Sequence, residues 1–141
     1  MMLKNLNIKV YKELNNELEK LWVNFEKESD NYYFQTYFWQ KYWFKQIQKY
    51  KSNSISMHIV VVKNNEEILF IFPFCIKKFS ILRTLMWSGF PFSDYNAPLI
   101  KKNLDISRQE FKFIWQLIYE NNQNLFDCIF LENQPEIINK K

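Results

Sequence analysis

The 141-residue chain has the length of one domain and is long enough to bury a hydrophobic core. Hydrophobic residues make up 48% and charged residues 24%, which is typical of a globular protein and excludes disorder over most of the length. The net charge of +4 comes from lysines dispersed among acidic residues, so it indicates a solvated surface and no nucleic-acid partner.

The scarcity of histidine, cysteine and glycine excludes several kinds of active site. The one histidine, His58, lies in a strand-like run without a Cys or His partner, so we interpret it as a core filler. Cys75 and Cys128 each lie in an apolar run and are expected to be buried, reduced thiols. A single glycine, Gly89, leaves no glycine-rich nucleotide loop, and no metal site is expected.

The N-terminal segment contains no apolar core like that of a signal peptide. No apolar run approaches the ~20 residues that a membrane-spanning helix needs, and the longest, Ile68–Ile76, suits a buried strand. We therefore expect a cytoplasmic protein.

Hydrophobic periodicity and turn residues predict a complete series of elements along the chain. In chain order these are a strand at Asn7–Tyr11, helices at Lys12–Glu28 and Gln35–Tyr50, a β-hairpin of Met57–Val62 and Ile68–Ile76, a strand at Ile81–Trp87, a short strand at the end of Asp94–Ile100, a helix from Ser107 to Asn121–Asn122 and a strand at Leu125–Leu131. A capping box of Ser107 and Glu110 marks the start of the third helix. Pro73 predicts a bulge or a locally unpaired edge within its strand.

The main elements follow the order β-α-α-β-β-β-α-β, which predicts an α/β (α+β) domain spanning residues 1–141, with a mixed sheet and helices on its faces. The second helix is unusually aromatic. Its predicted buried stripe consists of Trp39, Trp43, Ile47 and Tyr50, widened by Phe38 and Tyr42. Core packing, a partner surface and an interfacial membrane helix are all compatible with this stripe, and core packing is favoured.

Short segments along the chain carry a family resemblance. They are the aromatic-Gln-Thr-x-x-Trp segment Phe34–Trp39, the hydrophobic-Pro-hydrophobic segment Ile71–Phe74, Gly89 after the next strand, and Ser93–Tyr95. In this order they resemble the FemAB-like and CelD-type branch of the GNAT acyltransferases, over about residues 12–136. The order of the elements also resembles the first half of the GNAT fold.

The resemblance implies an enzyme built of two GNAT-like halves, in which the second half holds the acyl-CoA. This chain ends at Lys141, after the last strand of the first half, so the resemblance implies that the second lobe is absent from it. The loop before the third helix contains no glycine and carries Asp105, and Ser107 already caps the helix. We therefore expect no acyl-CoA (acetyl-CoA) to bind to this chain alone.

The best candidates for substrate binding are Ser93, Asp94, Tyr95 and Asn96, in the loop that follows Gly89. Asp94 is suited to orient or deprotonate an amine, and Tyr95 to bind it or to donate a proton. The same pattern also fits a turn in which Asp94 caps the backbone and Tyr95 packs beneath it.

Gln35 and Trp39 are the second candidates for substrate binding. For Trp39 the alternative is core packing, and for Gln35 it is a hydrogen bond to the backbone. The expected function is that of the N-terminal lobe of an N-acyltransferase, which moves an acyl or aminoacyl group to an amine acceptor with the help of a second lobe. The alternatives are a non-catalytic interaction module that self-associates or binds a partner, and a peripheral membrane protein.

Overall fold

The computed structural model describes residues 5–51, 54–136 and 138. Its strands are β1 (Leu6–Tyr11), β2 (Ser29–Asp30), β3 (Ile55–Asn64), β4 (Glu67–Phe79), β5 (Leu82–Trp87), β6 (Leu99–Lys101) and β7 (Cys128–Phe130). Its helices are α1 (Asn16–Glu28), the 3-10 turn η1 (Tyr33–Gln35), α2 (Tyr37–Lys51) and α3 (Arg108–Asn122).

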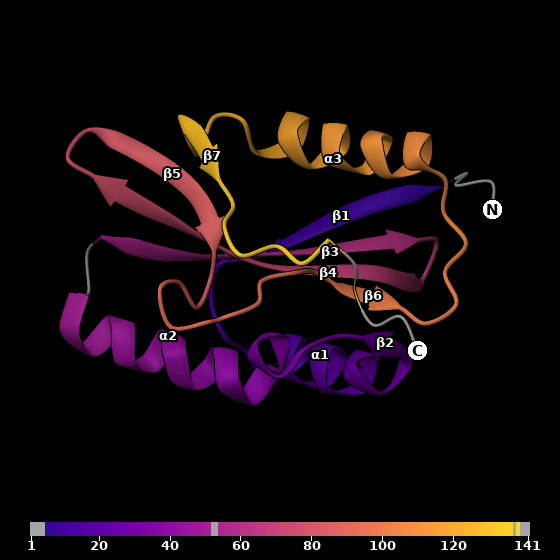
Figure 1. Ribbon diagram of the computed structural model, residues 1–141, viewed down its shortest axis with the longest axis horizontal. Coiled ribbons are helices and arrows are strands. Elements are labelled where there is room, and N and C mark those ends of the chain that lie inside the picture. The colour runs from indigo at the N-terminus through magenta and orange to yellow at the C-terminus, as the bar shows by residue number, and fades with distance from the viewer. Residues whose placement is uncertain (1–4, 52–53, 137, 139–141) are drawn as a thin grey trace.

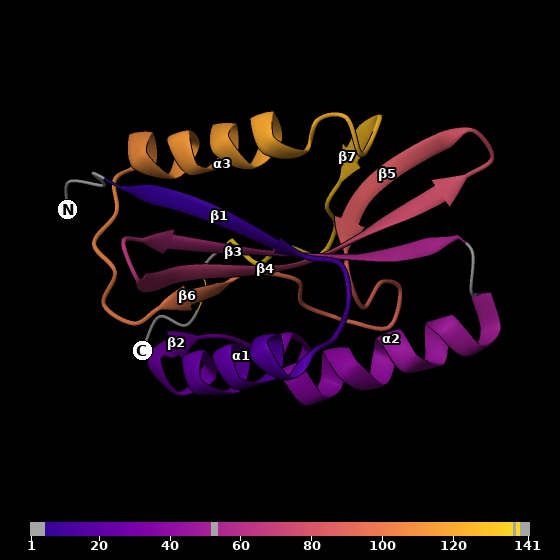
Figure 2. The same ribbon diagram turned by 180° about the vertical axis from the view of Figure 1, so that it is seen from behind.

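The strands form one sheet, which runs β1-β3-β4-β5-β7. Neighbours in it are antiparallel except β5 and β7, which are parallel and joined through α3. Helices α1 and α2 cover one face of the sheet and α3 covers the other (Figures 1 and 2). The predicted α/β class with helices on the faces of the sheet is therefore confirmed. The short β6 was expected, whereas β2, which pairs with it, was not.

Side-chain caps set where the long helices begin. Helix α1 begins later than predicted, because the Asn15 side chain accepts a hydrogen bond from the Leu18 N–H at 2.8 Å. The predicted capping box of α3 is confirmed: the Ser107 hydroxyl accepts from the Glu110 N–H, and the Glu110 carboxylate accepts from the Ser107 N–H. The free N–H groups of the first turn of α3 are therefore partly occupied by the chain itself.

Pro73 lies at the point along β4 where its neighbour on the side away from β3 changes from β6 to β5. The register shift between β3 and β4 occurs at Val62/Lys63, so the bulge is not at Pro73. On the other edge of β4, pairing with β6 ends at Ile71 and pairing with β5 begins at Phe74. Proline cannot donate to a ladder, and it stands in the gap between the two partners. The second alternative, a locally unpaired edge, holds for the missing donor only, because the Pro73 carbonyl accepts from the Ser88 N–H at 2.9 Å.

Two hydrophobic clusters lie on opposite faces of the sheet and share no residue. Trp22 of α1, fully buried, belongs to the cluster under α1 and α2. The cluster under α3 contains a row of stacked rings, with centroids 5.6 Å apart for Phe70 and Phe72 and 5.5 Å apart for Phe72 and Phe74. Both β3 and β4 contribute side chains to each cluster, so these two strands hold the layers together.

The buried face of α2 differs from the predicted stripe. Tyr37, Gln40, Trp43 and Phe44 are buried, whereas Phe38, Tyr42 and Tyr50 are exposed by 65%, 66% and 71%. Core packing therefore accounts for part of the aromatic content of this helix and leaves an aromatic face uncovered. None of the helices in the described residues is both long and apolar enough to cross a membrane.

The two cysteines differ in exposure. Cys75 is buried as expected, but Cys128 is exposed on β7, so the prediction of two buried thiols is wrong for Cys128. The reason is the position of β7, a three-residue strand whose residues are all exposed. An apolar run predicts a buried strand only where other layers of the protein cover both faces of that strand.

Candidate functional site

The segment that follows β5, residues 88–96, leaves the sheet beside the parallel neighbour β7 and crosses toward η1 and α2. Strand β5, helix α3 and strand β7 form a crossover unit of two parallel strands. In such units, ligands bind beyond the carboxyl ends of the strands. The fold therefore places this segment where α/β proteins form their sites.

Ser88 connects this segment to two others that are distant in the sequence. Its N–H and its hydroxyl lie 2.9 Å and 2.7 Å from the carbonyl oxygen of Pro73. The hydroxyl also contacts the Gln40 side-chain oxygen, and the Gln40 amide nitrogen donates to the Phe34 carbonyl at 2.7 Å. Ser88 and Gln40 are both about 1% exposed, so these polar groups are paired within the protein interior. The network fixes the end of β5 to α2.

Gly89 makes the close approach to α2 possible. Its φ of +103° lies in the region that side chains rarely adopt. A β-carbon at this position would stand 2.8 Å from the Trp39 ring and 3.1 Å from the Ser93 hydroxyl oxygen. A side chain can therefore occupy this position only if the Trp39 ring moves.

Gln35 joins η1 to the loop. Its amide nitrogen donates to the Tyr95 carbonyl at 2.8 Å, and its side-chain oxygen accepts from the Tyr32 N–H at 2.9 Å. The rings of Tyr32 and Tyr95 stack on each other, with centroids 5.3 Å apart. Gln35 therefore bonds to the backbone, as its alternative interpretation held.

Ser93 and Asn96 form a hydrogen bond within the loop. The Ser93 hydroxyl donates to the Asn96 side-chain oxygen at 2.6 Å. The Asn96 amide nitrogen donates to the Glu132 carbonyl at 3.2 Å, and the Asn96 N–H donates to the Asn133 carbonyl at 2.9 Å. These bonds tie the loop to the chain that follows β7. Ser93 and Asn96 are buried, so they hold the loop in shape and do not face a ligand.

The six predicted substrate-binding residues thus come together, in two roles. Gln35, Ser93 and Asn96 are buried and build the loop. Asp94 is exposed, and within the described residues its carboxylate has no hydrogen bond or ion pair, so it does not cap the turn. Tyr95 is 52% exposed, and Trp39 is half-buried.

An apolar groove of about 330 Å³ borders this loop along α2. Its lining residues are Trp39, Tyr42, Trp43, Gln46, Ile47 and Phe92. The indole nitrogen of Trp43 is buried and has no hydrogen-bond partner among the described residues. A donor left unpaired beside a groove offers a contact to a bound acceptor atom. The groove therefore combines apolar surface with the side-chain amide of Gln46, and Asp94 lies two residues beyond its lining residue Phe92.

Comparison of the chain with protein-family models, with curated proteins and with solved structures finds no match. The described residues contain no group of three or more His, Cys, Asp or Glu side chains placed to hold a metal ion.

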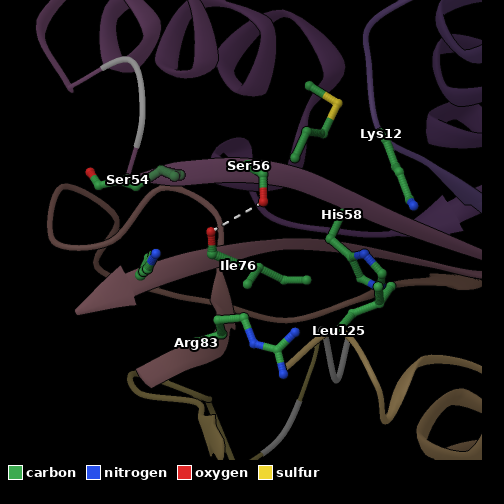
Figure 3. A pocket seen from close by; sticks show the side chains of 10 residues that line it. Lys12, Ser54, Ser56, His58, Ile76, Arg83 and Leu125 are labelled. Carbon is green, nitrogen blue, oxygen red and sulfur yellow. Dashed lines mark hydrogen bonds between the residues drawn. The ribbon is translucent and has the colours of Figure 1, made fainter. Parts of the chain in front are cut away.

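A second hollow, of about 370 Å³, lies at the opposite end of β5 (Figure 3). Lys12, His58 and Arg83 line it, together with Ser56 and Leu125. Burial, followed by the charge of Lys12, lowers the pKa of His58 to about 4, so the imidazole is neutral at pH 7. Sequence analysis missed this site, because the residues that surround His58 come from separate elements and no spacing along the chain unites them.

Proposed function

We propose that this chain is the acceptor-side lobe of an N-acyltransferase of the FemAB-like and CelD-type kind, which transfers an acyl or aminoacyl group to an amine. The element order and the sheet order β1-β3-β4-β5-β7, with α1 and α2 before the hairpin and α3 before the last strand, support a GNAT-like lobe. The short strands β2 and β6 pair with each other, and β6 also pairs with β4 on the side of β5 without changing this order.

The observation that carries the proposal is the meeting of the four segments of the family resemblance. Trp39 lies against Gly89, the Pro73 carbonyl bonds to Ser88, and Gln35 bonds to Tyr95. The contact of Pro73 with Ser88 continues the pairing of β4 with β5, whereas the contacts of Gln35 and Trp39 with the loop join segments that no shared ladder brings together. Their contact at the carboxyl end of β5 supports a common role in building one site.

The proposed chemistry on this lobe is limited to the amine. Asp94 accepts the proton that an ammonium acceptor must lose before its nitrogen attacks the acyl carbonyl carbon. The bond between the acyl carbon and the carrier then breaks, and the departing carrier anion takes up the second proton that the acylated nitrogen loses. The groove beside Phe92 takes the apolar part of the acceptor. A second GNAT-like lobe, on the same polypeptide or on a separate chain, supplies the acyl-CoA and the donors that stabilise the oxyanion.

A cytoplasmic location belongs to this proposal. Both cysteines are free, which suits a reducing compartment. The occupied cap of α3 and the exposed Asp105 support the expectation that this chain alone binds no acetyl-CoA. Calorimetric titration with micromolar acetyl-CoA is expected to give no saturable heat. Coenzyme A phosphates seated at Ser107 in a soaked crystal would contradict it.

The activity is tested on the full-length protein or, where the lobes are separate chains, on their mixture. Thiol release from acetyl-CoA is followed with a panel of primary amines. We expect Asp94→Asn to lower kcat about 10²-fold, since it removes the proton acceptor. Glu13→Gln, which alters an exposed carboxylate before α1, is the control and keeps the wild-type rate. Unchanged activity of Asp94→Asn would remove Asp94 from the mechanism, and absence of any transfer would refute the proposed activity.

The uncovered aromatic face of α2 favours a second candidate function, an interaction module that binds a second copy of itself. Phe38 and Tyr42 are exposed by 65% and 66%, and Phe92 beside them by 70%. Side chains of this size rarely cluster on the surface of a monomer without a partner.

We expect the chain alone to self-associate in sedimentation velocity, and the double variant Phe38→Ser/Tyr42→Ser to shift it toward monomer because the aromatic surface is lost. Phe113→Ser, on α3 at the opposite face of the sheet, is the matched control and leaves the association unchanged. A monodisperse wild-type monomer that binds no hydrophobic dye argues against this function. Co-flotation with anionic vesicles would indicate a peripheral membrane surface instead.

A further inference from the structure

The hairpin of β4 and β5 ends in a tip, residues 79–82, that projects beyond the neighbouring strands. The pairing of β4 with β3 ends at Lys77, and the pairing of β5 with β7 ends at Thr84. The last cross-strand pair of the hairpin joins Phe79 to Leu82, and no described strand flanks that pair. Figures 1 and 2 show the hairpin as an arm at one end of the molecule. The side chains of the tip belong to neither hydrophobic cluster.

The tip exposes large apolar side chains to solvent. Ile81 is 85% exposed, more than any other large hydrophobic residue described, and Phe79 and Leu82 are exposed by 47% and 53%. Ser80, with a φ of 54°, and Ile81 form the turn between the two strands. Asn, Asp and Gly are the usual residues of such turns, so the turn itself does not call for an isoleucine. Apolar side chains that are held in water without a packing role indicate a contact surface.

Basic side chains flank the tip on both faces of the hairpin. Lys77 shares a face with Phe79, and its Nζ atom lies 4.3 Å from the centroid of that ring. Lys78 and Arg83 are paired across the hairpin one position before the tip, so both belong to the opposite face. Arg83 pairs with Asp127 at 2.9 Å, whereas neither lysine forms an ion pair with a described residue. Two uncompensated ammonium groups therefore stand behind the tip, one on each face.

Acidic residues are absent from the elements that form this end of the molecule. Residues 31–65 and 68–93 include no Asp or Glu, and the one acidic residue of β4, Glu67, begins the strand at its opposite end. The C-terminal end of α2 lies at the same end of the molecule as the hairpin tip (Figures 1 and 2). It adds the exposed Tyr50, whose ring centroid lies 5.3 Å from the Lys49 Nζ atom. This end of the molecule thus combines exposed apolar groups with positive charge.

We propose that the hairpin tip, residues 79–82, inserts into the surface of a membrane that contains anionic lipids. Ile81 enters the boundary of the acyl chains, and the ammonium groups of Lys77 and Lys78 stay at the level of the headgroup phosphates. A protein partner would lie against one face of the hairpin. Cations on both faces instead suit an arm that enters a plane of anionic headgroups end-on. The cytoplasmic leaflet carries such lipids, so the membrane contact agrees with the proposed cytoplasmic location.

Co-flotation of the full chain with vesicles measures this contact. One set of vesicles is phosphatidylcholine alone, and in the other about one third of the lipid is phosphatidylserine. We expect saturable binding to the anionic vesicles and at least about tenfold weaker binding to phosphatidylcholine. Equal binding to both sets, or no binding to the anionic set, would overturn the proposal. If vesicle binding is absent and a hairpin variant changes the sedimentation of the chain, the tip is a contact between copies of this chain.

Flotation alone does not distinguish the hairpin from the exposed aromatic face of α2, so two double variants are compared. Ile81→Ser/Leu82→Ser is expected to lower the partition coefficient about tenfold, because the inserted apolar surface is lost. Phe38→Ser/Tyr42→Ser removes two exposed side chains from α2 and is expected to change the coefficient less than about twofold. Circular dichroism verifies that both variants fold. An equal loss in both, or a loss only in the α2 variant, would contradict the proposal.

Two lysine variants separate a defined contact from general charge attraction. Lys77→Gln/Lys78→Gln is expected to weaken binding to the anionic vesicles at least about tenfold. Lys20→Gln/Lys27→Gln removes the same charge from exposed positions on α1 and is expected to weaken binding less than about threefold. Equal effects of the two variants would overturn the proposal. None of these results depends on acyl transfer, so the proposed activity stands or falls separately.

Discussion

Replacing Trp22 with alanine is expected to lower the free energy of unfolding by about 3–5 kcal/mol. The side chain is fully buried between α1 and the sheet, and its ring meets that of Tyr37 edge-on at a centroid distance of 5.8 Å. Its indole nitrogen donates to the Gln35 carbonyl at 3.0 Å. The variant therefore loses packing in the larger helical layer and also leaves a buried carbonyl of η1 without its donor.

Urea unfolding followed by far-UV circular dichroism measures this loss. Trp22→Phe is the matched control, since it keeps an aromatic ring and removes the N–H group. We expect it to lower the free energy of unfolding by about 1–2 kcal/mol. A loss below about 1 kcal/mol for Trp22→Ala would show that α1 does not pack on the sheet as described.

Gly89→Ala is expected to destabilise the protein by about 2–4 kcal/mol, because it combines backbone strain at φ +103° with a 2.8 Å approach to the Trp39 ring. The ring must move, so we also expect a change in Trp39 packing beside the groove. Urea unfolding gives the energy, and quenching of tryptophan fluorescence by acrylamide reports the average exposure of the five tryptophans, which is compared between the variant and the wild type.

The reciprocal change at Ser80 is the control for the backbone contribution. Ser80 is exposed and has a φ of 54°, a conformation that glycine adopts more readily. Ser80→Gly is expected to leave stability unchanged or to raise it by up to about 1 kcal/mol. Gly89→Ala with wild-type stability and quenching would mean that the loop does not pass as close to α2 as described.

Capping and turn residues predicted where an element begins or changes partner, if a single local interaction determines that position. The capping box of Ser107 and Glu110 placed the start of α3, and Pro73 marked the change of partner along β4. The start of α1 was missed because Asn15 caps it, and nothing in the hydrophobic period distinguishes a capping residue from one in the first turn.

The buried face of α2 could not be predicted from its period. Aromatic residues occur on every side of this helix, so more than one stripe fits a 3.6-residue repeat. Gln40, a polar residue, occupies the core because Phe34 and Ser88 satisfy its side chain. Such partners are distant in the sequence, and only the fold brings them together.

The candidate site was partly predictable for the same reason. The composition of the loop drew attention to Ser93–Asn96, and these residues do meet Gln35 and Trp39. Which of them face solvent depends on bonds such as Asn96 to Glu132, made across the end of β7. The hollow beside His58 was invisible in the sequence, since its lining residues come from separate elements.

The separation of the two hydrophobic clusters by the sheet has a consequence for local dynamics. The clusters share no side chain, so α3 can detach briefly while α1 and α2 stay packed, and the reverse also holds. Strands β3 and β4 belong to both layers, and their amides become open to solvent exchange only when both layers separate. We therefore expect hydrogen exchange to slow from the two helical layers toward the central hairpin.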